Sequence, residues 1–312
     1  MRVLVIGGTG FIGRHVVARL SKADHAVIVP TRRYQHGRDL LVYPGLNLIG
    51  ADIHNDQALE ALLGEVDAVI NLAGILHSRP GRPYGSDFKL VHVDLPRRIA
   101  AACRRLGVKR LLHVSALGAS AEGPSGYLRS KADGEAAVLA EFAAYPDGAC
   151  TVFRPSVVFG PEDNFMNMFA RLARWMPLIP LARSQARLQP VYVGDVASAI
   201  VGALGNSRTY GRTYSLAGFA DYSLGELVEL AARWSGHPRR VLPIPTFLGR
   251  LQAFVFECLP GEPLLSRDNL DSLAIDNVCD VPMAPELGSV PLPLESVAPA
   301  YLARQGKALV HL

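Results

Sequence analysis

The feature that most constrains the fold is a glycine pattern that follows a short, mostly apolar run at residues 2–6. The glycines Gly7, Gly10 and Gly13 form a GxxGxxG pattern, and helical spacing begins directly after Gly10. This order of strand, glycine turn and helix is typical of the first half of a βαβ unit that binds a dinucleotide. Gly7 allows the tight turn, Gly10 lets the backbone approach a pyrophosphate, and Gly13 lets helix and strand pack closely. The N–H groups at the start of the helix favour the anion, so the pattern predicts a dinucleotide site. Thr9, Phe11 and Ile12, which lie between these glycines, are further expected cofactor-binding residues.

The alternation of strand and helix continues through the first half of the chain. Further strands are expected at 26–29, 47–49, 68–72, 110–115 and 151–154. Helices are expected at 11–20, 56–63, 86–106 and 127–143. Strands separated by helices in this way pair in parallel and are buried on both faces. The sequence therefore predicts an α/β fold, a doubly wound parallel sheet of the Rossmann type.

The pattern becomes less regular after Gly160, which suggests a second unit. Later helices are expected at 164–175, 196–204, 224–235, 246–258, 267–275 and 294–304, with Asp195 as N-cap of the second of these and a short strand at 240–242. A proline-rich stretch, MPLIPLA, follows the first of them. We expect residues 1–160, with 187–217 returning to them, to form the dinucleotide domain. Residues 161–186 and 218–312 should form a smaller C-terminal α/β lobe.

The end of the second expected strand bears on the choice of cofactor. Dinucleotide sites that bind NAD place an acid there to hold the ribose 2′-hydroxyl, but this chain has Arg32 and Arg33. Two guanidinium groups suit a 2′-phosphate, so NADP is favoured over NAD. The other interpretation is a solvated loop end. Asp52 and Ile53, after the third strand, are placed to meet the adenine.

Composition and charge exclude several other classes of protein. The chain has 312 residues, 49% of them hydrophobic, and a net charge of +4 from scattered basic residues, which argues against a nucleic-acid partner. The histidines and the four cysteines show no metal-ligand spacing, so no metal is expected. Widely spaced cysteines fit a reducing compartment, and no apolar run is long enough to span a membrane. A cytoplasmic protein is expected, with peripheral attachment to the inner membrane left open.

Five motifs carry a family resemblance over nearly the whole chain. They are GGTGFIG at residues 7–13, NLAG at 71–74, YLRSK at 127–131, RPSVVFGP at 154–161 and QPVYVGDVA at 189–197. In this order they resemble the short-chain dehydrogenase/reductase superfamily in its extended, epimerase/dehydratase-like and atypical forms. The subgroup most similar contains the NADPH-binding accessory subunit of respiratory complex I and its bacterial relatives, which are not all enzymes.

The resemblance assigns roles to the pair Tyr127 and Lys131. In the family the Tyr is the acid/base and the Lys holds the nicotinamide ribose. Four residues apart on a helix, the two side chains share a face, and a nearby cation favours the phenolate. The resemblance also implies cofactor contacts from Leu72, Ala73 and Gly74 and from Pro155, Ser156 and Val157.

Two departures from the family pattern put catalysis in doubt. The family has a Ser or Thr pair after the fifth strand, whereas this chain has Ser115 followed by Ala116, which cannot donate a hydrogen bond. Ser115 is therefore the candidate third catalytic residue. His92 stands where the family often has an Asn in a proton relay, and both a relay and a packing role are open.

Three functions remain open at this point. The first is an NADP(H)-dependent oxidoreductase acting on a small carbonyl or quinone-type substrate. The second is a non-catalytic NADPH-binding scaffold within a respiratory or quinone-related complex, and the third is a nucleotide-sugar epimerase or dehydratase. The segment Asn164 to Pro180, rich in Met and aromatic residues, is either core of the smaller lobe or a lid, partner or membrane surface.

Overall fold

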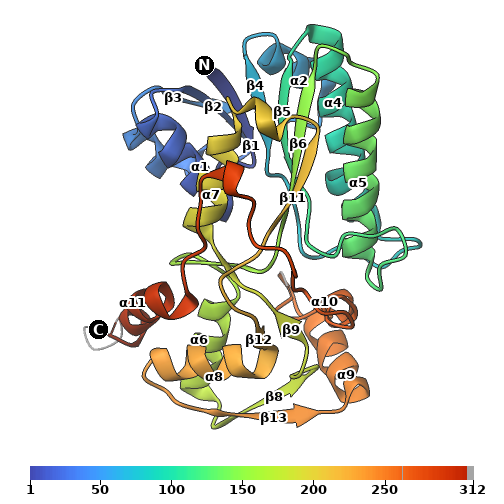
Figure 1. Ribbon diagram of the computed structural model, residues 1–312. Helices are drawn as coiled ribbons and strands as arrows, with labels where there is room; N and C mark the ends of the chain where they lie inside the picture. The colour runs from blue at the N-terminus through green and yellow to red at the C-terminus, as the bar shows by residue number, and fades with distance from the viewer. Residues whose placement is uncertain (262, 308–312) are drawn as a thin grey trace.

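The centre of the molecule is a seven-stranded parallel sheet (Figure 1). The protein is described here by a computed structural model, which covers residues 1–261 and 263–307. The strand order is β11-β6-β5-β4-β1-β2-β3, so the sheet grows outward in both directions from the β1/β4 pair. The strands are β1 (Arg2–Ile6), β2 (Ala26–Thr31), β3 (Leu46–Gly50), β4 (Ala68–Asn71), β5 (Arg110–Val114), β6 (Ala149–Pro155) and β11 (Arg212–Leu216). This is the doubly wound sheet that the sequence predicts, and the prediction is confirmed.

Helices cover both faces of this sheet, which explains why its strands are apolar throughout. One face packs against α1 (Phe11–Lys22) and α7 (Val193–Ala203), and the other against α2 (Asp56–Leu63), α4 (Leu95–Leu106) and α5 (Gly126–Ala143). In β1, at the centre, Val3 pairs with Val27 on one side and with Ala68 on the other. The side chains of residues 3–6 are all fully buried.

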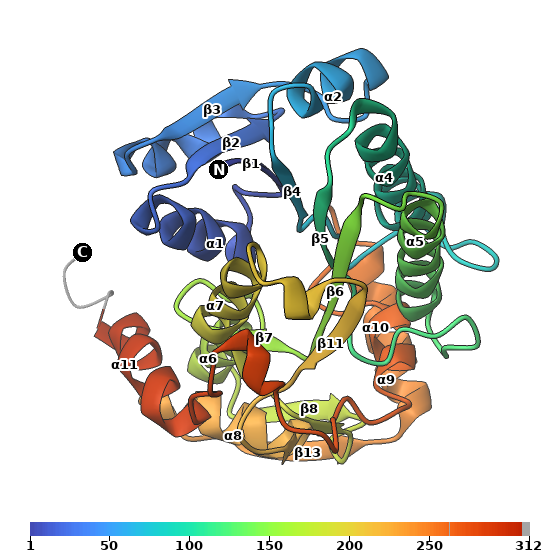
Figure 2. The same cartoon turned by 45° about the horizontal axis from the view of Figure 1, so that its top comes forward.

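A smaller lobe lies beyond the carboxyl ends of the strands (Figures 1 and 2). Its core joins α6 (Met166–Trp175), α8 (Leu224–Trp234) and α11 (Leu294–Lys307). A parallel two-stranded ribbon, β8 (Leu178–Ala182) with β13 (Arg240–Ile244), forms the end farthest from the sheet. Helix α9 (Thr246–Glu257) packs against β8, and α10 (Arg267–Ser272) packs against both α9 and α5. Two short strand pairs connect the lobe to the sheet: β7 (Val158–Phe159) with β10 (Val191–Tyr192), and β9 (Arg187–Leu188) with β12 (Tyr222–Ser223). The domain boundaries expected from the sequence stay a prediction.

The helix expected at 86–106 is interrupted. It consists of α3 (Ser86–Phe88), a π-helical turn η2 (Lys89–Asp94) and α4. Pro96 has no N–H to bond the carbonyl of His92, so the regular ladder cannot run through this point. The same carbonyl packs against α5 at Gly134, where an added Cβ would lie 1.7 Å from the His92 oxygen. The interruption therefore fixes the place of His92 against the helix that carries Tyr127 and Lys131.

Three further sequence expectations differ from the structure. Asp195 is not an N-cap, because α7 begins at Val193 with Tyr192 as its cap, and the Asp195 carboxylate instead accepts from the Leu292 N–H at 2.8 Å. The proline-rich stretch becomes β8, which Pro180 can join because the ribbon has only two strands and leaves one edge unpaired. Strand β11, which the sequence analysis did not identify, pairs with β6 through five residues.

Candidate functional site: a dinucleotide pocket at the carboxyl edge of the sheet

The glycine turn between β1 and α1 has the geometry that its sequence predicts. Gly7 has φ +81°, and an added Cβ would lie 3.0 Å from the backbone of Leu72. At Gly13 an added Cβ would lie 2.2 Å from the Gly7 oxygen, so only glycine fits there. Gly10 is the N-cap of α1 and provides no side-chain cap. The first N–H groups of α1 are thus left for an anion, and this cradle fits a pyrophosphate.

Arg14, which sequence reasoning missed, holds a second loop over the glycine turn. Its guanidinium donates to the carbonyls of Thr9 (3.1 Å) and His36 (2.7 Å) and pairs with Asp39. These last two residues belong to the 3₁₀ segment η1 (Tyr34–Val42). At Gly37 in the same segment, an added Cβ would lie 2.9 Å from the Thr9 methyl group. The position of η1 beside the glycine turn therefore depends on Arg14, which lies one turn into α1.

The end of β2 presents the two arginines that the sequence singled out. Arg32 and Arg33 are exposed, and their side chains make no hydrogen bond or ion pair with any residue that the structure describes. Asp52, after β3, is also exposed and accepts from the His54 N–H at 3.0 Å, while Ile53 is half-buried. The part of the site where the sequence predicts the adenine thus carries two arginines without an acidic partner.

The loop after β4 approaches α5. The Asn71 amide oxygen accepts from the Ala73 N–H at 3.1 Å and so shapes the turn 72–74. An added Cβ at Gly74 would lie 3.3 Å from the Lys131 ammonium nitrogen. The structure therefore brings together the expected contacts at Leu72, Ala73 and Gly74 with the Lys of the YxxxK motif.

Lys131 is an almost fully buried cation with a single hydrogen bond. It is 5% exposed, and Nζ donates to the Val114 carbonyl at 3.2 Å. Burial lowers its pKa to about 8. No carboxylate contacts its ammonium group among residues 1–261 and 263–307. An ammonium group with unused donors at this depth is suited to hold hydroxyl groups of a bound ligand.

Tyr127 lies one turn before Lys131 on α5, with its ring edge-on to His92 and Phe88. Burial, and secondarily the charge of Asp268, raise its pKa to about 12. The YxxxK spacing predicts that Lys131 lowers the Tyr127 pKa and favours the phenolate, whereas in the structure burial and Asp268 raise that pKa. In this environment the phenol stays protonated at neutral pH, so Tyr127 is suited to donate a proton rather than to accept one.

His92 is held as a neutral imidazole. Its Nε2 accepts from the Ile75 N–H at 3.0 Å, and its Nδ1 lies 2.9 Å from the Ser130 hydroxyl, which itself donates to the Tyr127 carbonyl at 2.8 Å. Burial lowers the His92 pKa to about 2. Of the two roles left open by the sequence, this geometry favours the packing role over a proton relay.

Ser115 provides an unused polar atom at the end of β5. Its Oγ is buried and has no hydrogen-bond partner in the described part of the chain. Buried hydroxyls are nearly always paired, so an orphan next to Val114, whose carbonyl accepts from Lys131, is a place for a ligand oxygen. The next residue, Ala116, is buried and offers no second hydroxyl.

The smaller lobe contributes two residues that sequence reasoning missed. Asp268 of α10 accepts from the N–H groups of Gly126 (2.6 Å) and Tyr127 (3.1 Å) at the start of α5. Asn277 accepts from the Ser156 hydroxyl at 2.6 Å and donates to the Leu117 carbonyl at 3.0 Å. Ser156, with its buried and half-buried neighbours Pro155 and Val157, is thus tied to the lobe. No local pattern in the sequence marks either contact, because the partners are over 100 residues apart.

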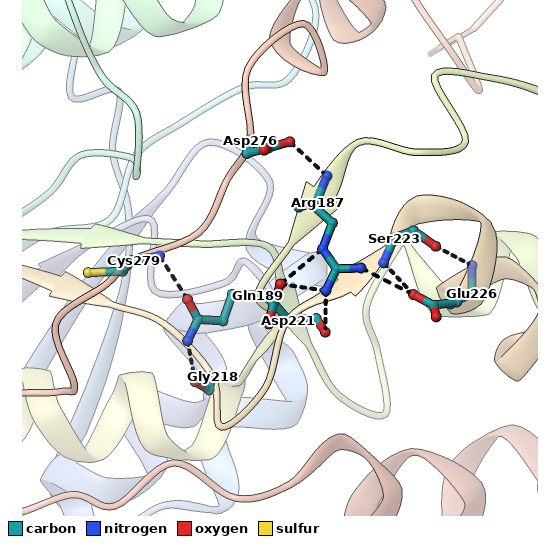
Figure 3. A network of polar contacts seen from close by, with 8 residues as sticks. All are labelled: Arg187, Gln189, Gly218, Asp221, Ser223, Glu226, Asp276 and Cys279. Atoms are coloured by element: carbon teal, nitrogen blue, oxygen red, sulfur yellow. Dashed lines mark hydrogen bonds and ion pairs between the residues drawn. The ribbon is translucent and has the colours of Figure 1, made fainter.

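A polar network around Arg187 and Gln189 reaches Asp276 and Cys279, on either side of Asn277 in the chain (Figure 3). The Gln189 side chain donates to the Gly218 carbonyl at 2.9 Å and accepts from the Cys279 N–H at 2.8 Å. Arg187 binds Asp221 with its guanidinium, and its backbone N–H donates to Asp276 at 3.0 Å. The segment 276–279 is therefore anchored on both sides of the residue that reaches the pocket.

The segment Asn164 to Pro180 is mainly core. Met166 and Phe169 are buried in the smaller lobe together with Ile179. Its exposed large apolar side chains are Trp175 (83%) and Leu178 (50%). The segment therefore packs as core along one side and exposes apolar groups near its C-terminal end.

Searches of the described residues for a metal site and for a membrane span gave no candidates. No group of three His, Cys, Asp or Glu side chains in residues 1–261 and 263–307 could hold a metal ion. Within the same ranges no helix is long and apolar enough to cross a membrane.

Comparison with known proteins identifies the family. The sequence model of the NAD dependent epimerase/dehydratase family matches residues 3–217, which include all seven strands of the sheet, from β1 to β11. The chain belongs to this family. The family binds a nucleotide cofactor of the NAD(P) type, and the resemblance to extended short-chain dehydrogenases/reductases is confirmed.

Two curated relatives have different names. NADH dehydrogenase [ubiquinone] 1 alpha subcomplex subunit 9, mitochondrial, from Mus musculus, is 34% identical over 299 residues, which cover 93% of this chain and 77% of the relative. Ceramide reductase from Caulobacter vibrioides is 31% identical over 202 residues, 64% of this chain and 59% of that protein. Among solved structures, UDP-glucose 4-epimerase from Thermotoga maritima has a TM-score of 0.73 at 20% identity and covers all of both chains. That likeness shows the shared fold.

Proposed function

We propose that the protein is an NADPH-dependent reductase of a small carbonyl or quinone-type substrate. The observation that carries this proposal is the grouping of Tyr127, Lys131 and Ser115 at the carboxyl edge of the sheet. A protonated phenol, a buried cation with free donors and an orphan hydroxyl are the groups that a carbonyl reduction needs beside a dinucleotide. Membership in a nucleotide-binding family supports the cofactor half of the proposal.

The groups in the pocket would share the work as follows. The glycine turn and the start of α1 would hold the pyrophosphate, and Lys131 would hold the nicotinamide ribose. When bound, the cofactor supplies a hydride for the carbonyl carbon. Tyr127 would donate its phenolic proton to the carbonyl oxygen, and Ser115 would position that oxygen through its free Oγ. Because burial keeps the Tyr127 phenol protonated at neutral pH, the proton that reduction needs is already in place.

Arg32 and Arg33 support the choice of NADPH over NADH. Both guanidinium groups are exposed and unpaired, and a 2′-phosphate would give them a charge-assisted partner. NADPH should bind at least about tenfold more tightly than NADH, which one good charged contact can supply. Fluorescence titrations with both dinucleotides at fixed salt measure the ratio. Replacing both arginines by Ala should abolish the preference, whereas Arg97→Ala, on the exposed side of α4, should leave it unchanged. Equal affinities in the unaltered protein would contradict the assignment.

A scaffold function is the second candidate, and Ala116 is the observation that favours it. The family's second hydroxyl is missing, and His92 is locked as a neutral packing residue, so the proton-relay groups are incomplete. The mouse relative is named as a subunit of NADH dehydrogenase. In a scaffold, the dinucleotide would stabilise the fold and the protein would join a larger complex. An epimerase or dehydratase would use the same pocket and regenerate its cofactor, and the fold of the UDP-glucose 4-epimerase is compatible with this.

Changing Tyr127 to Phe separates the reductase from the scaffold. Loss of the phenolic oxygen should lower NADPH oxidation by about 10² to 10⁴, the usual contribution of a general acid. The shift in melting temperature on adding NADPH should persist, because the pyrophosphate cradle is unchanged. Rates are measured with a panel of quinones and carbonyls. Equal rates in the two proteins would remove Tyr127 from catalysis, and a normal melting shift without turnover on any substrate would favour the scaffold.

A further inference from the structure

Helix α9 in the smaller lobe carries a large, mostly exposed apolar face, and the Arg267 guanidinium of α10 lies over one of its rings, Phe254, at 5.4 Å from the ring centroid. Five of its side chains are exposed: Phe247 (69%), Leu248, Leu251 (59%), Phe254 and Val255. At about 100° per residue, these five positions span roughly 120° of the helix surface. Single exposed apolar residues are common on protein surfaces, but five on one helix face mark a binding surface.

The opposite side of α9 shows why this face stays exposed. The helix rests on the lobe through its small residues Gly249 and Ala253, and a Cβ added at Gly249 would lie 2.3 Å from the Ala182 Cβ. The buried cluster on this side is small, with Ala182, Ala253 and Leu270 at its centre. The bulky side chains therefore point away from the fold, an inversion of the usual amphipathic arrangement.

The apolar face continues onto the neighbouring ribbon. Ala182 lies under α9, and on the same side of the ribbon Leu178 and Leu242 are 50% and 48% exposed. Trp175 follows at the end of α6, three residues before Leu178. We call this set of residues the apolar end of the lobe. It lies at the end of the molecule farthest from the sheet (Figures 1 and 2).

Two arginines at the edge of the apolar end have no acidic partner among the described residues. Arg240 is paired in register with Leu178 on β8, and Arg183 directly follows β8. Both are exposed, and neither side chain has a hydrogen bond or ion pair with a described residue. Of the nearby acids, Glu257 and Asp271 pair with Arg267 and Arg250, and Glu229 accepts from the Val241 N–H at 3.2 Å.

We propose that the apolar end of the lobe docks on the surface of an anionic lipid bilayer. Phe and Leu side chains on one helix face, an exposed Trp and unpaired arginines are the combination that inserts into the headgroup region. A protein partner would need acidic groups placed to match each arginine, whereas anionic headgroups adapt to them. Docking here would leave the pocket, at the other end of the lobe, facing away from the lipid.

Co-sedimentation of the full chain with vesicles tests the proposal. The protein should bind vesicles that contain phosphatidylglycerol and phosphatidylcholine, and bind phosphatidylcholine alone at least tenfold less. The triple variant Phe247→Ser/Leu251→Ser/Phe254→Ser should lose at least tenfold in binding. Val42→Ser, at a 77% exposed site in η1, is the matched control and should bind normally.

The arginines have their own test. Arg183→Gln and Arg240→Gln should each weaken binding about fivefold at low salt, and less at high salt. Arg97→Gln should have no effect. Throughout, the NADPH-induced melting shift should stay normal, which separates this proposal from the proposed function. Binding that the triple variant retains, or no binding to either vesicle, would overturn the proposal. So would a concentration-dependent dimer in lipid-free solution that the triple variant abolishes, since a second copy would then cover the face.

Discussion

The sheet domain and the smaller lobe depart in opposite directions from the usual separation of apolar and charged groups. The sheet domain buries ionisable groups: Lys131, His92, His113 and Arg110 are each at most 5% exposed. The smaller lobe instead exposes bulky apolar groups, with Phe247 and Trp175 at 69% and 83%. Each departure costs free energy unless a partner inside the fold, or a bound molecule, compensates it.

Two buried cations in the sheet domain show that burial alone does not mark a site. Arg110, at the start of β5, donates to the carbonyls of Ala149, Ala203 and Leu204 and to the hydroxyls of Thr151 and Thr209. Its hydrogen-bonding needs are met within the fold. Lys131, near the other end of the same strand, has one bond to a carbonyl. The difference assigns a structural role to Arg110 and leaves Lys131 for a ligand.

The largest loss of stability is expected at Gly13, the glycine of the turn that has the least room for a side chain. In Gly13→Ala the new Cβ would lie 2.2 Å from the Gly7 oxygen and 2.6 Å from the Gly8 Cα, so backbone must move. We expect a loss of about 3 kcal/mol or more in the free energy of unfolding, with loss of dinucleotide binding. Gly205→Ala is the control, because nothing lies within 4 Å of its Cβ, and it should change stability by less than about 0.5 kcal/mol. Urea denaturation measures both, and similar losses would show that the turn is not tightly packed.

A smaller effect of opposite sign is expected at Lys131. Removing a buried cation in Lys131→Met should stabilise the ligand-free protein at pH 7 by roughly 1–3 kcal/mol, while NADPH affinity falls. The folded pKa near 8 lies below the ordinary 10.5, so the unfolded chain binds more protons between these values and stability should rise with pH there.

The Lys131→Met variant should lack this rise, which thermal melts at pH 8 and pH 10 can detect. Lys109→Met, at an exposed site, should behave like the unaltered protein. A destabilised Lys131→Met variant with unchanged affinity would mean that the lysine serves the fold and not the ligand.

The smallest effect concerns the contact between the two regions. In Asp268→Asn the charge at the start of α5 is lost, and only one amide oxygen remains for the two N–H groups of Gly126 and Tyr127. We expect a loss of about 1 kcal/mol, as for other N-cap changes, and faster hydrogen exchange at residues 126–130. Asp271→Asn breaks only an ion pair with Arg250 and should leave that exchange unchanged. Identical exchange in both variants would show that α10 does not support α5.

The sequence was sufficient for the first half of the fold because its signals are local. The glycine pattern needs only neighbouring residues to define the turn, and alternating apolar runs define the buried strands. The YxxxK spacing likewise places Tyr127 and Lys131 on one helix face, which the structure shows beside Gly74. The spacing does not reveal the Tyr127 pKa, because that pKa depends on burial and on Asp268, which is distant in the sequence.

The second half was harder to predict because its contacts are long-range. Asp268 and Asn277 meet partners 142 and 160 residues away, at Gly126 and Leu117, and neither has a recognisable motif. The prolines of β8 argue against a strand, so the sequence did not predict it. The composition of α9 resembles that of a core helix, so the sequence did not predict its exposed apolar face. A helix rich in Phe and Leu is usually buried, and only the packing of Gly249 and Ala253 reveals which side faces the lobe.

The Asp268 contact also has a consequence for the order in which the chain matures during synthesis. Strands β1 to β6 and helix α5 leave the ribosome before α10, so the sheet can begin to fold while the lobe is still unmade. The start of α5 then lacks its carboxylate partner until residue 268 has emerged, 142 residues after Gly126. A nascent chain stopped before that point would have the glycine turn but would lack the two hydrogen bonds from Gly126 and Tyr127 to Asp268. The start of α5 is therefore completed only when the C-terminal part of the chain has been made.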